Sequence, residues 1–208
     1  MKLAELTIKD FVDVLGSDAP APGGGSVSAL CGANGAALCA MVCRLTQGKK
    51  KYAEFDGLMA EIIPQAQTLY EKLILSIDKD TDAFNLVSAA FKMPKETPEE
   101  KAARSQKIAE GMVESTKVPF ETMELCLQVL HLVDRMEGKF NQNAASDLGV
   151  AALNLGCAMK GAWLNVCINL GSLKDAAMAE DYKTRGQKMV EEGEALSQKI
   201  YQTILQSL

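Results

Sequence analysis

A row of amide and carboxylate side chains interrupts an otherwise apolar segment in the last third of the sequence. Its members are Asn143, Asp147, Asn154, Asn165 and Asn169. On a helix with 3.6 residues per turn these positions fall within about 80° of one another, so they share one face. A buried polar group without a partner costs on the order of 1–3 kcal/mol. The row therefore either hydrogen-bonds neighbouring helices and fixes their register, or lines a polar pocket for a ligand rich in amide and amino groups.

Three acids lie close together in the segment 76–84. Asp78 and Asp82 are four residues apart and share a helix face, whereas Asp80 points away from it. Like charges at this spacing raise each other's pKa, which suits a general base or the stabilisation of a cationic substrate. A solvated acidic patch has the same spacing, so both interpretations stay open.

The run PAPGGGS at residues 20–26 precedes a predicted helix. Glycines let the backbone approach a ligand closely, and the free N–H groups of a helix start can hold an anion. No Gly-Lys-Ser/Thr follows and no strand is predicted before the run, so it is neither a Walker motif nor a dinucleotide-binding turn. The lysines at 49–51, at the other end of the same helix, offer a second possible site, for carboxylates. Lysines are nevertheless ordinary at a helix C-terminus.

Helices are the elements expected to position these groups. Apolar residues recur at i, i+3 and i+4, and no run of β-branched residues alternates with polar ones. We expect an all-α fold, a single domain over residues 1–208 built as an antiparallel bundle of long, partly kinked helices. The predicted helices run from Thr7 to Gly16, about Ser26 to Thr46, about Glu54 to Phe91, Pro98 to about Glu137, about Ala144 to Leu170 and about Lys174 to Ser207. Pro64 is expected to kink the third helix or to lie in its first turns, and Pro119 to interrupt the fourth.

The composition is that of a folded globular protein. Of 208 residues, 48% are hydrophobic and 24% are charged, which argues against disorder. The net charge is −5, so no nucleic-acid partner is expected. Residues 19–43 carry no charge, but their prolines, glycines and small side chains predict a tightly packed buried helix rather than a membrane span. The first residues form no apolar leader, and the cytoplasm is the expected compartment.

The six cysteines and the single histidine form no recognisable metal-binding pattern. The cysteines, at positions 31, 39, 43, 126, 157 and 167, lack C-x-x-C spacing and are expected to be reduced core thiols. Cys39 and Cys43 can share a helix face, but a metal there would need further soft ligands. His131 stands alone and is expected to be structural. No metal site is therefore predicted.

The motifs together resemble the cyclodeaminase/cyclohydrolase family of folate enzymes, which includes the C-terminal domain of formiminotransferase-cyclodeaminase. The matching segments, in order along essentially the whole chain, are PAPGGGS (20–26), TQGKKKY (46–52), DKDTDAF (78–84), MPK (93–95), VP (118–119), NAASDLGVAA (143–152) and NVCINL (165–170). The resemblance implies an all-helical homodimer with folate sites near the subunit interface. It also implies that no metal or redox cofactor is needed.

Two activities occur in that family. A stand-alone bacterial methenyltetrahydrofolate cyclohydrolase hydrolyses 5,10-methenyltetrahydrofolate to 10-formyltetrahydrofolate. The cyclodeaminase converts 5-formiminotetrahydrofolate into 5,10-methenyltetrahydrofolate and ammonia. The chain has no room for a formiminotransferase domain, so the resemblance implies the cyclohydrolase, with the cyclodeaminase as the alternative. A catalytically silent folate-binding helical protein is a third interpretation.

The resemblance also implies roles for particular residues. The methenyl substrate is a delocalised cation that water attacks at the bridging carbon, so a carboxylate is needed to stabilise the cation or to take the proton. Asp82 is the first choice for this base and Asp147 the second, with Asp78 raising the pKa of Asp82. The residues expected to bind substrate are Gly23, Gly24, Gly25 and Ser26 in the turn, Asn143, Asn165 and Asn169 for the pterin amides or the water, and Lys49 and Lys51 for the glutamate carboxylates.

Overall fold

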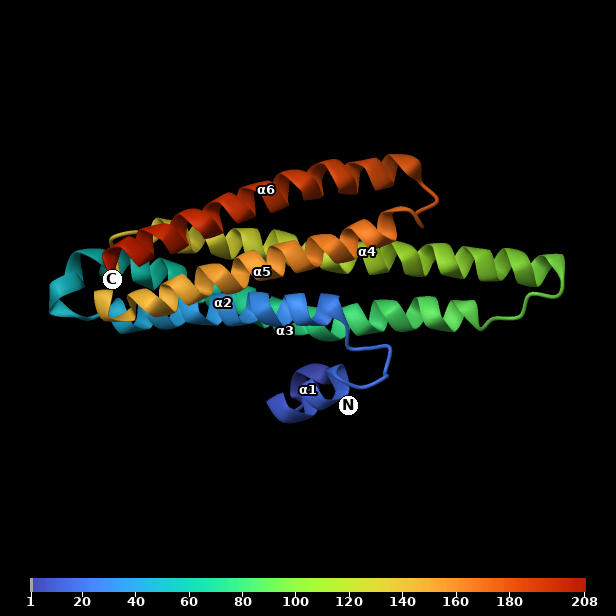
Figure 1. The fold of residues 1–208 in the computed structure, drawn as a ribbon, viewed down its shortest axis with the longest axis horizontal. Helices are drawn as coiled ribbons and strands as arrows, with labels where there is room; N and C mark the ends of the chain where they lie inside the picture. The colour runs from blue at the N-terminus through green and yellow to red at the C-terminus, as the bar shows by residue number, and fades with distance from the viewer. Residues whose placement is uncertain (1) are drawn as a thin grey trace.

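The computed structural model describes residues 2–208, and every regular element within them is helical. The α-helices are α1 (Ile8–Leu15), α2 (Gly24–Thr46), α3 (Asp56–Phe91), α4 (Pro98–Arg135), α5 (Ala145–Leu170) and α6 (Ala176–Ser207), and the short 3-10 helices are η1 (Leu3–Glu5), η2 (Lys50–Phe55) and η3 (Gln142–Ala144). Helices α2 to α6 lie side by side in an elongated bundle, with α1 outside it (Figure 1). The expected all-α class is confirmed.

Capping side chains explain the starts of three α-helices, α1, α4 and α6. The side chain of Thr7 accepts a hydrogen bond from the Asp10 N–H at the start of α1. Thr97 and Glu100 form a capping box at the start of α4, and Asp175 caps α6. By contrast, α2 begins after Gly23 with no side-chain cap of its own. Its first N–H groups are therefore open to a partner from elsewhere in the fold.

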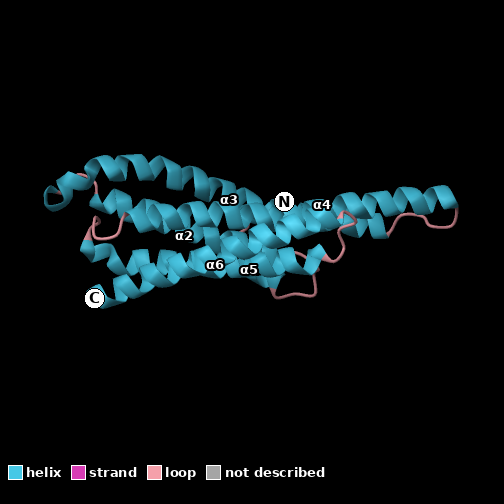
Figure 2. Ribbon diagram, turned by 90° about the horizontal axis from the view of Figure 1, so that it is seen from above, coloured by secondary structure: helices cyan, strands magenta, loops and turns pink. Residues whose placement is uncertain are grey.

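The prolines do not break the long helices. Pro64 lies inside α3 and Pro119 inside α4, and both helices continue through them. The expected interruption at Pro119 is therefore wrong. Proline removes one backbone hydrogen bond, but Val118, Pro119 and Phe120 are all buried, and their burial favours keeping this part of α4 in place. The unbroken α3 and α4 form a hairpin that extends past the other helices (Figure 2).

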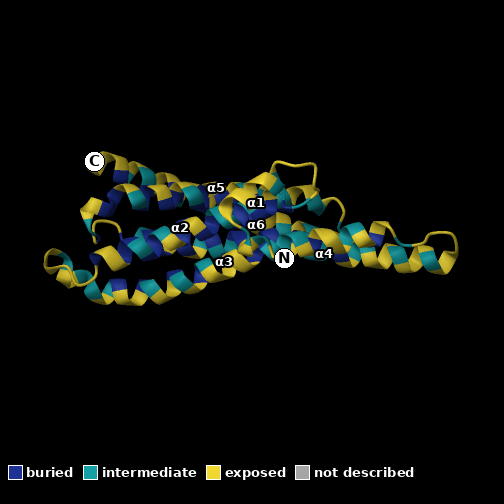
Figure 3. Ribbon diagram, turned by 90° about the horizontal axis from the view of Figure 1, so that it is seen from below, coloured by how far each residue is buried: buried dark blue, intermediate teal, exposed yellow. Residues whose placement is uncertain are grey.

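The central helix of the bundle is α2, which packs against α3 and α5. Small residues allow the close approach: a Cβ atom on Gly35 would lie 2.6 Å from Cγ of Leu155, and one on Gly161 would lie 2.4 Å from Oγ of Ser28. Both α2 and the segment Gln142–Leu170 are long and apolar enough to cross a membrane, but most of α2 is buried inside the bundle, as in a core helix. The inward faces of the helices carry the buried residues (Figure 3).

The six cysteines are all free thiols. Cys39, Cys43 and Cys126 are buried as expected, and Cys31 is half-buried. Cys157 and Cys167 are exposed, so the expectation of core thiols is wrong for these two. Both lie on α5, which packs against α2, α4 and α6 and leaves one face uncovered.

Candidate functional site

A polar pocket of ≈ 340 Å³ opens where the N-terminal end of α2 meets α3, α4 and the last turns of α5. We call it the Asp80 pocket. Its volume is within the range of about 300–1,000 Å³ that is usual for small-molecule sites. It is lined by Pro20, Ala21, Gly23, Gly24 and Gly25 before and at the start of α2, by Asp80, Thr81, Phe84 and Val87 of α3, by Met112 and Ser115 of α4, and by Asn165, Ile168 and Asn169 of α5.

The carboxylate of Asp80 lies against the uncapped start of α2. Its Oδ2 accepts a hydrogen bond from Oγ of Ser26 at 3.0 Å, and the Ser26 backbone N–H also donates to the carboxylate. A Cβ atom on Gly25 would lie 2.0 Å from Oδ1 of Asp80, so this close approach requires glycine at position 25. The positive end of the α2 dipole faces the negative charge. Asp80 thus supplies from α3 the cap that α2 lacks.

Burial dominates the electrostatics of Asp80. It raises the pKa of the carboxyl above its ordinary value, and the hydrogen bonds from Ser26 counteract this only in part. A partly desolvated carboxylate with a raised pKa is a better proton acceptor than an exposed one. It also attracts a cationic ligand more strongly, because less water screens the charge. The pocket therefore holds a group suited to both roles expected of a catalytic carboxylate.

Two amides of the polar row reach the Asp80 pocket. Nδ2 of Asn165 donates to the Gly161 carbonyl at 2.8 Å, and Nδ2 of Asn169 donates to the Ser115 carbonyl at 2.8 Å. These bonds fix the orientation of both amides. Their Oδ1 atoms accept no hydrogen bond from any residue between 2 and 208, so they can accept one from the N–H groups of a ligand.

The other two acids of the 78–84 segment lie outside the pocket. Oδ1 of Asp78 accepts a hydrogen bond from the Leu3 N–H at 2.6 Å, which attaches the N-terminal segment to α3. Asp82 is exposed and does not line the pocket. The structure thus gives neither of them a contact with the Asp80 pocket within one chain, and their catalytic roles stay predictions. Sequence reasoning missed Asp80, although the missing acidic cap in the first turn of α2 was a signal for such a partner.

The remaining predicted residues gather at the opposite end of the bundle. Lys49, Lys51 and Asn143 line a shallow pocket of ≈ 390 Å³. There the Gln142 N–H donates to the hydroxyl of Tyr52 at 3.1 Å, and this bond lowers the pKa of Tyr52. Asp147 lies in the first turn of α5, and at about 1.5 Å per residue it is about 27 Å from Asn165 along the helix axis. Within one chain, the two ends of the polar row therefore lie at opposite ends of the bundle, and they cannot line the same pocket.

Asn154 and His131 belong to neither place. Asn154 is half-buried, and its Nδ2 donates to the Val150 carbonyl of its own helix. Nε2 of His131 lies 3.2 Å from Oε1 of Glu192 on the surface, between α4 and α6. This contact fits the structural role expected of His131.

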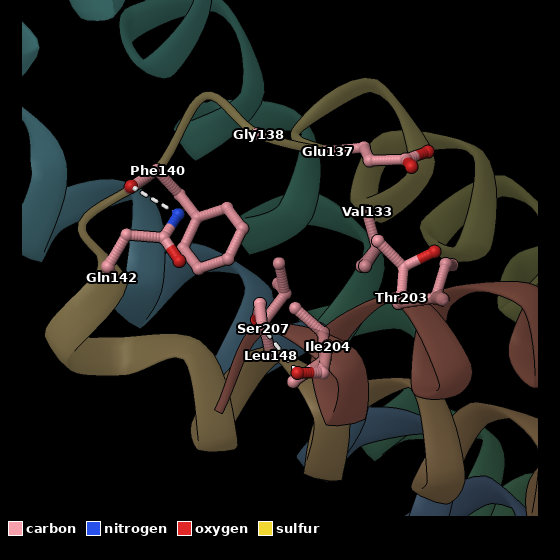
Figure 4. Close-up of a pocket in the computed structure, with 10 residues that line it drawn as sticks. Val133, Glu137, Gly138, Phe140, Gln142, Leu148, Thr203, Ile204 and Ser207 are labelled. Carbon is pink, nitrogen blue, oxygen red and sulfur yellow. Dashed lines mark hydrogen bonds between the residues drawn. The ribbon is translucent and has the colours of Figure 1, made fainter.

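Two further cavities are poorer candidates for a folate-sized ligand, one because of its lining and the other because of its size. A groove of ≈ 540 Å³ beneath α1 is lined almost entirely by apolar side chains, among them Leu6, Phe11 and Ile74. A cavity of ≈ 90 Å³ lies between the end of α4, the segment after it and the end of α6, where Phe140, Leu148 and Ile204 contribute its apolar wall (Figure 4). It is too small for a bicyclic ligand. The Asp80 pocket is a better candidate than either of these two cavities.

Comparison with known proteins adds independent information. Residues 7–188 match the family model described as formiminotransferase-cyclodeaminase. The chain is 41% identical over 198 residues to a methenyltetrahydrofolate cyclohydrolase of Methylorubrum extorquens, covering 95% of each chain. It is 34% identical over 190 residues to the formimidoyltransferase-cyclodeaminase of Rattus norvegicus, covering 91% of this chain but 35% of that protein. A solved formiminotetrahydrofolate cyclodeaminase of Thermotoga maritima superposes with a TM-score of 0.81 at 27% identity, covering 98% of this chain and 96% of the other.

Proposed function

The chain belongs to the formiminotransferase-cyclodeaminase family, and we propose that it acts as a methenyltetrahydrofolate cyclohydrolase in one-carbon metabolism. The proposed reaction is the hydrolysis of 5,10-methenyltetrahydrofolate to 10-formyltetrahydrofolate. The observation that carries the proposal is the similarity to the Methylorubrum extorquens cyclohydrolase along nearly the full length of both chains. The Asp80 pocket supports it, because it offers a carboxylate to a cationic substrate.

In this proposal Asp80, rather than Asp82, is the general base that accepts a proton from the attacking water. The substrate carries its positive charge over N5, the bridging carbon and N10. Water adds to that carbon while the Asp80 carboxylate accepts its proton, which gives a neutral carbinolamine. Asp80 then returns the proton to N5 as the bond between N5 and the carbon breaks, and the carbinolamine hydroxyl loses its own proton to solvent as the C=O bond of the formyl group forms on N10. One proton is thus released per turnover, which balances the positive charge of the substrate, and no step calls for a redox cofactor.

The two amides have a positioning role in the proposed reaction. The Oδ1 atoms of Asn165 and Asn169 accept hydrogen bonds from the N–H groups of the pterin ring. Because each Nδ2 is already held by a backbone carbonyl, the acceptors are fixed before the substrate binds. The pterin then lies with its reactive edge toward Asp80.

A cyclodeaminase is the second candidate function. The solved Thermotoga maritima cyclodeaminase shares the whole fold, and this observation favours the alternative. The same pocket would then hold 5-formiminotetrahydrofolate, where N10 attacks the formimino carbon and ammonia leaves. Asp80 would move the proton from N10 to the leaving nitrogen, so the structural argument for Asp80 is common to both reactions.

We further propose a homodimer whose folate sites lie near the subunit interface. Val150, Leu153, Leu164 and Ile168 are exposed on the uncovered face of α5, and Ile168 exposes 78% of its surface. Ile168 also lines the Asp80 pocket, so a second copy that covers this face would lie beside the pocket mouth.

The dimer also offers a use for the lysines. The Asp80 pocket contains no lysine or arginine, although the glutamate tail of folate carries carboxylates. Two α5 helices that pack antiparallel about a two-fold axis place Asn143 and Asp147 of one chain near Asn165 and Asn169 of its partner. Lys49 and Lys51 of the partner subunit are then within reach of the tail. We propose that each site is completed in this way.

The assay that tests the function uses the purified full chain and both substrates. Loss of the methenyl absorbance above the uncatalysed rate is the result expected for the cyclohydrolase. Appearance of that absorbance with one ammonia per formimino substrate supports the cyclodeaminase instead. No turnover of either substrate, together with tight folate binding, would overturn both enzymatic proposals.

Complementation tests the shared site. Asp80→Asn homodimers and Lys49→Ala/Lys51→Ala homodimers are each expected to work poorly on a polyglutamylated substrate. Mixed dimers would contain one site free of both substitutions if the lysines act across the interface. Recovery of activity after mixing is therefore the expected result, and no recovery despite subunit exchange would contradict the proposal.

A further inference from the structure

Three sulfur atoms converge in the core at the end of the bundle opposite to the Asp80 pocket. Sγ of Cys39 lies 3.8 Å from Sδ of Met136, and Sγ of Cys43 lies 3.5 Å from the same atom. The two cysteines are four residues apart on α2 and share a face, and Met136 directly follows α4. All three residues are fully buried. The structure thus supplies the third soft ligand that the sequence pattern of Cys39 and Cys43 lacked.

We infer that Cys39, Cys43 and Met136 form a binding site for a soft monovalent cation such as Cu(I) or Ag(I). Thiols and thioethers are the ligands that select such ions. With metal–sulfur bonds of about 2.3 Å, the three sulfurs of a trigonal site lie about 4 Å apart. The two separations that join the cysteine sulfurs to Sδ of Met136, 3.8 and 3.5 Å, are close to this value. Within residues 2–208 no three His, Cys, Asp or Glu side chains are grouped for a metal ion, so the thioether is an essential third ligand.

The charge balance favours a monovalent ion. One of the two thiols ionises on binding: its S–H bond breaks as the S–metal bond forms, and the proton leaves to solvent. One thiolate and one monovalent cation sum to zero, so the apolar core gains no net charge. The other cysteine binds as a neutral thiol, and Met136 as a neutral thioether.

Two of the three sulfur ligands lie near helix ends, and local opening of these ends gives the ion access to the buried site. Cys43 lies in the last turn of α2, which ends at Thr46, and Met136 lies just past the end of α4. Helix ends open locally at a much lower free-energy cost than the whole core. At about 1.5 Å per residue, Cys43 is about 27 Å from Gly25 along α2. Cation binding at this site can therefore be measured independently of the folate reaction. A negative result in the cation experiment would leave the proposed function untouched, and the reverse also holds.

Silver titration of the full chain tests the inference, with Ag(I) as a probe that undergoes no redox change. The parent for this experiment carries Cys157→Ser and Cys167→Ser, which remove the two exposed thiols. Native mass spectrometry is expected to find one tightly held Ag(I) per chain. The concentration of glutathione that removes half of it measures the affinity.

Matched substitutions identify the ligands. Met136→Leu is expected to weaken Ag(I) binding at least about tenfold, whereas Met123→Leu, at a fully buried methionine within α4, should leave it unchanged. Cys43→Ala should abolish the tight ion, and Cys126→Ala, at another buried cysteine, should not. A thermal unfolding scan without silver verifies that each variant folds. Equal silver affinity in the Met136→Leu and Met123→Leu variants would overturn the inference, as would tight binding that survives Cys43→Ala.

Discussion

Gly25 and Asp80 approach each other so closely that a Cβ atom on Gly25 would lie 2.0 Å from Oδ1 of Asp80. Gly25→Ala is therefore expected to displace the carboxylate and to lower kcat by about a hundredfold, the usual cost of moving a catalytic group by about 1 Å. Gly57→Ala is the control, because a Cβ atom there meets nothing within 4 Å and Gly57 lies outside the Asp80 pocket. Steady-state kinetics of the two variants make the comparison. Equal kcat values would show that the close approach is not needed.

The two aspartates at positions 80 and 82 give opposite predictions. Asp80→Asn is expected to lower turnover by at least about a hundredfold, because the amide cannot accept the proton from water. Asp82→Asn should keep nearly normal turnover, because Asp82 is exposed and lies outside the pocket of its own chain. Initial rates with saturating substrate measure both. The reverse pattern would return the base to Asp82, as the sequence alone suggested.

The activity is expected to fall at low pH, and protonation of Asp80 is expected to determine the acidic limb of the pH profile. Its pKa is raised in the folded protein, so the carboxylate becomes protonated, and inactive as a base, at a higher pH than an ordinary aspartate. The Ser26 hydroxyl donates to the carboxylate and lowers the pKa, so Ser26→Ala should move the limb of kcat/KM to still higher pH. Ser28→Ala, which removes a hydroxyl bonded to the Gly24 carbonyl, serves as the control. A limb unmoved by Ser26→Ala would mean that another group titrates.

Asp78 is expected to act on stability rather than on the chemical step. Asp78→Ala removes the acceptor of the Leu3 N–H, and a hydrogen bond to a charged group contributes about 1.5–3 kcal/mol, of which loss of the buried, unpartnered Oδ2 offsets only a part. The variant should therefore unfold at a lower urea concentration while kcat stays near that of the parent. Asp82→Ala, at an exposed position, should change neither quantity. A large loss of kcat at unchanged stability would instead make Asp78 part of the catalytic machinery.

Much of the fold follows from local sequence rules. Periodicity gives the long helices, and caps such as Thr7 and Thr97 fix their starts, because both signals act within a few residues. The interruption expected at Pro119 was wrong because burial of its neighbours, a tertiary effect, keeps α4 continuous.

The site was harder to predict for a related reason. The spacing of the 78–84 acids indicates which of them share a face, but not which face meets the start of α2. The acid that lines the pocket is Asp80, which the spacing placed on a different helix face from Asp78 and Asp82. Likewise, the row from Asn143 to Asn169 shares a helix face in sequence, yet the length of α5 divides it between two ends of the bundle. Contacts between distant elements decide both cases, and the spacing within one helix carries no information about them.

Arg44 is the one charged residue of α2, and this has a practical consequence for experiments on this protein. None of the ion pairs within residues 2–208 involves a residue of α2, and close packing of small side chains contributes much of its contact with α3 and α5. Salt screens exposed ion pairs such as Lys199–Asp134, but it does not weaken close packing of apolar side chains. Ionic strength can therefore be varied widely to measure how charge contributes to ligand capture, while the helix that forms the floor of the Asp80 pocket stays in place.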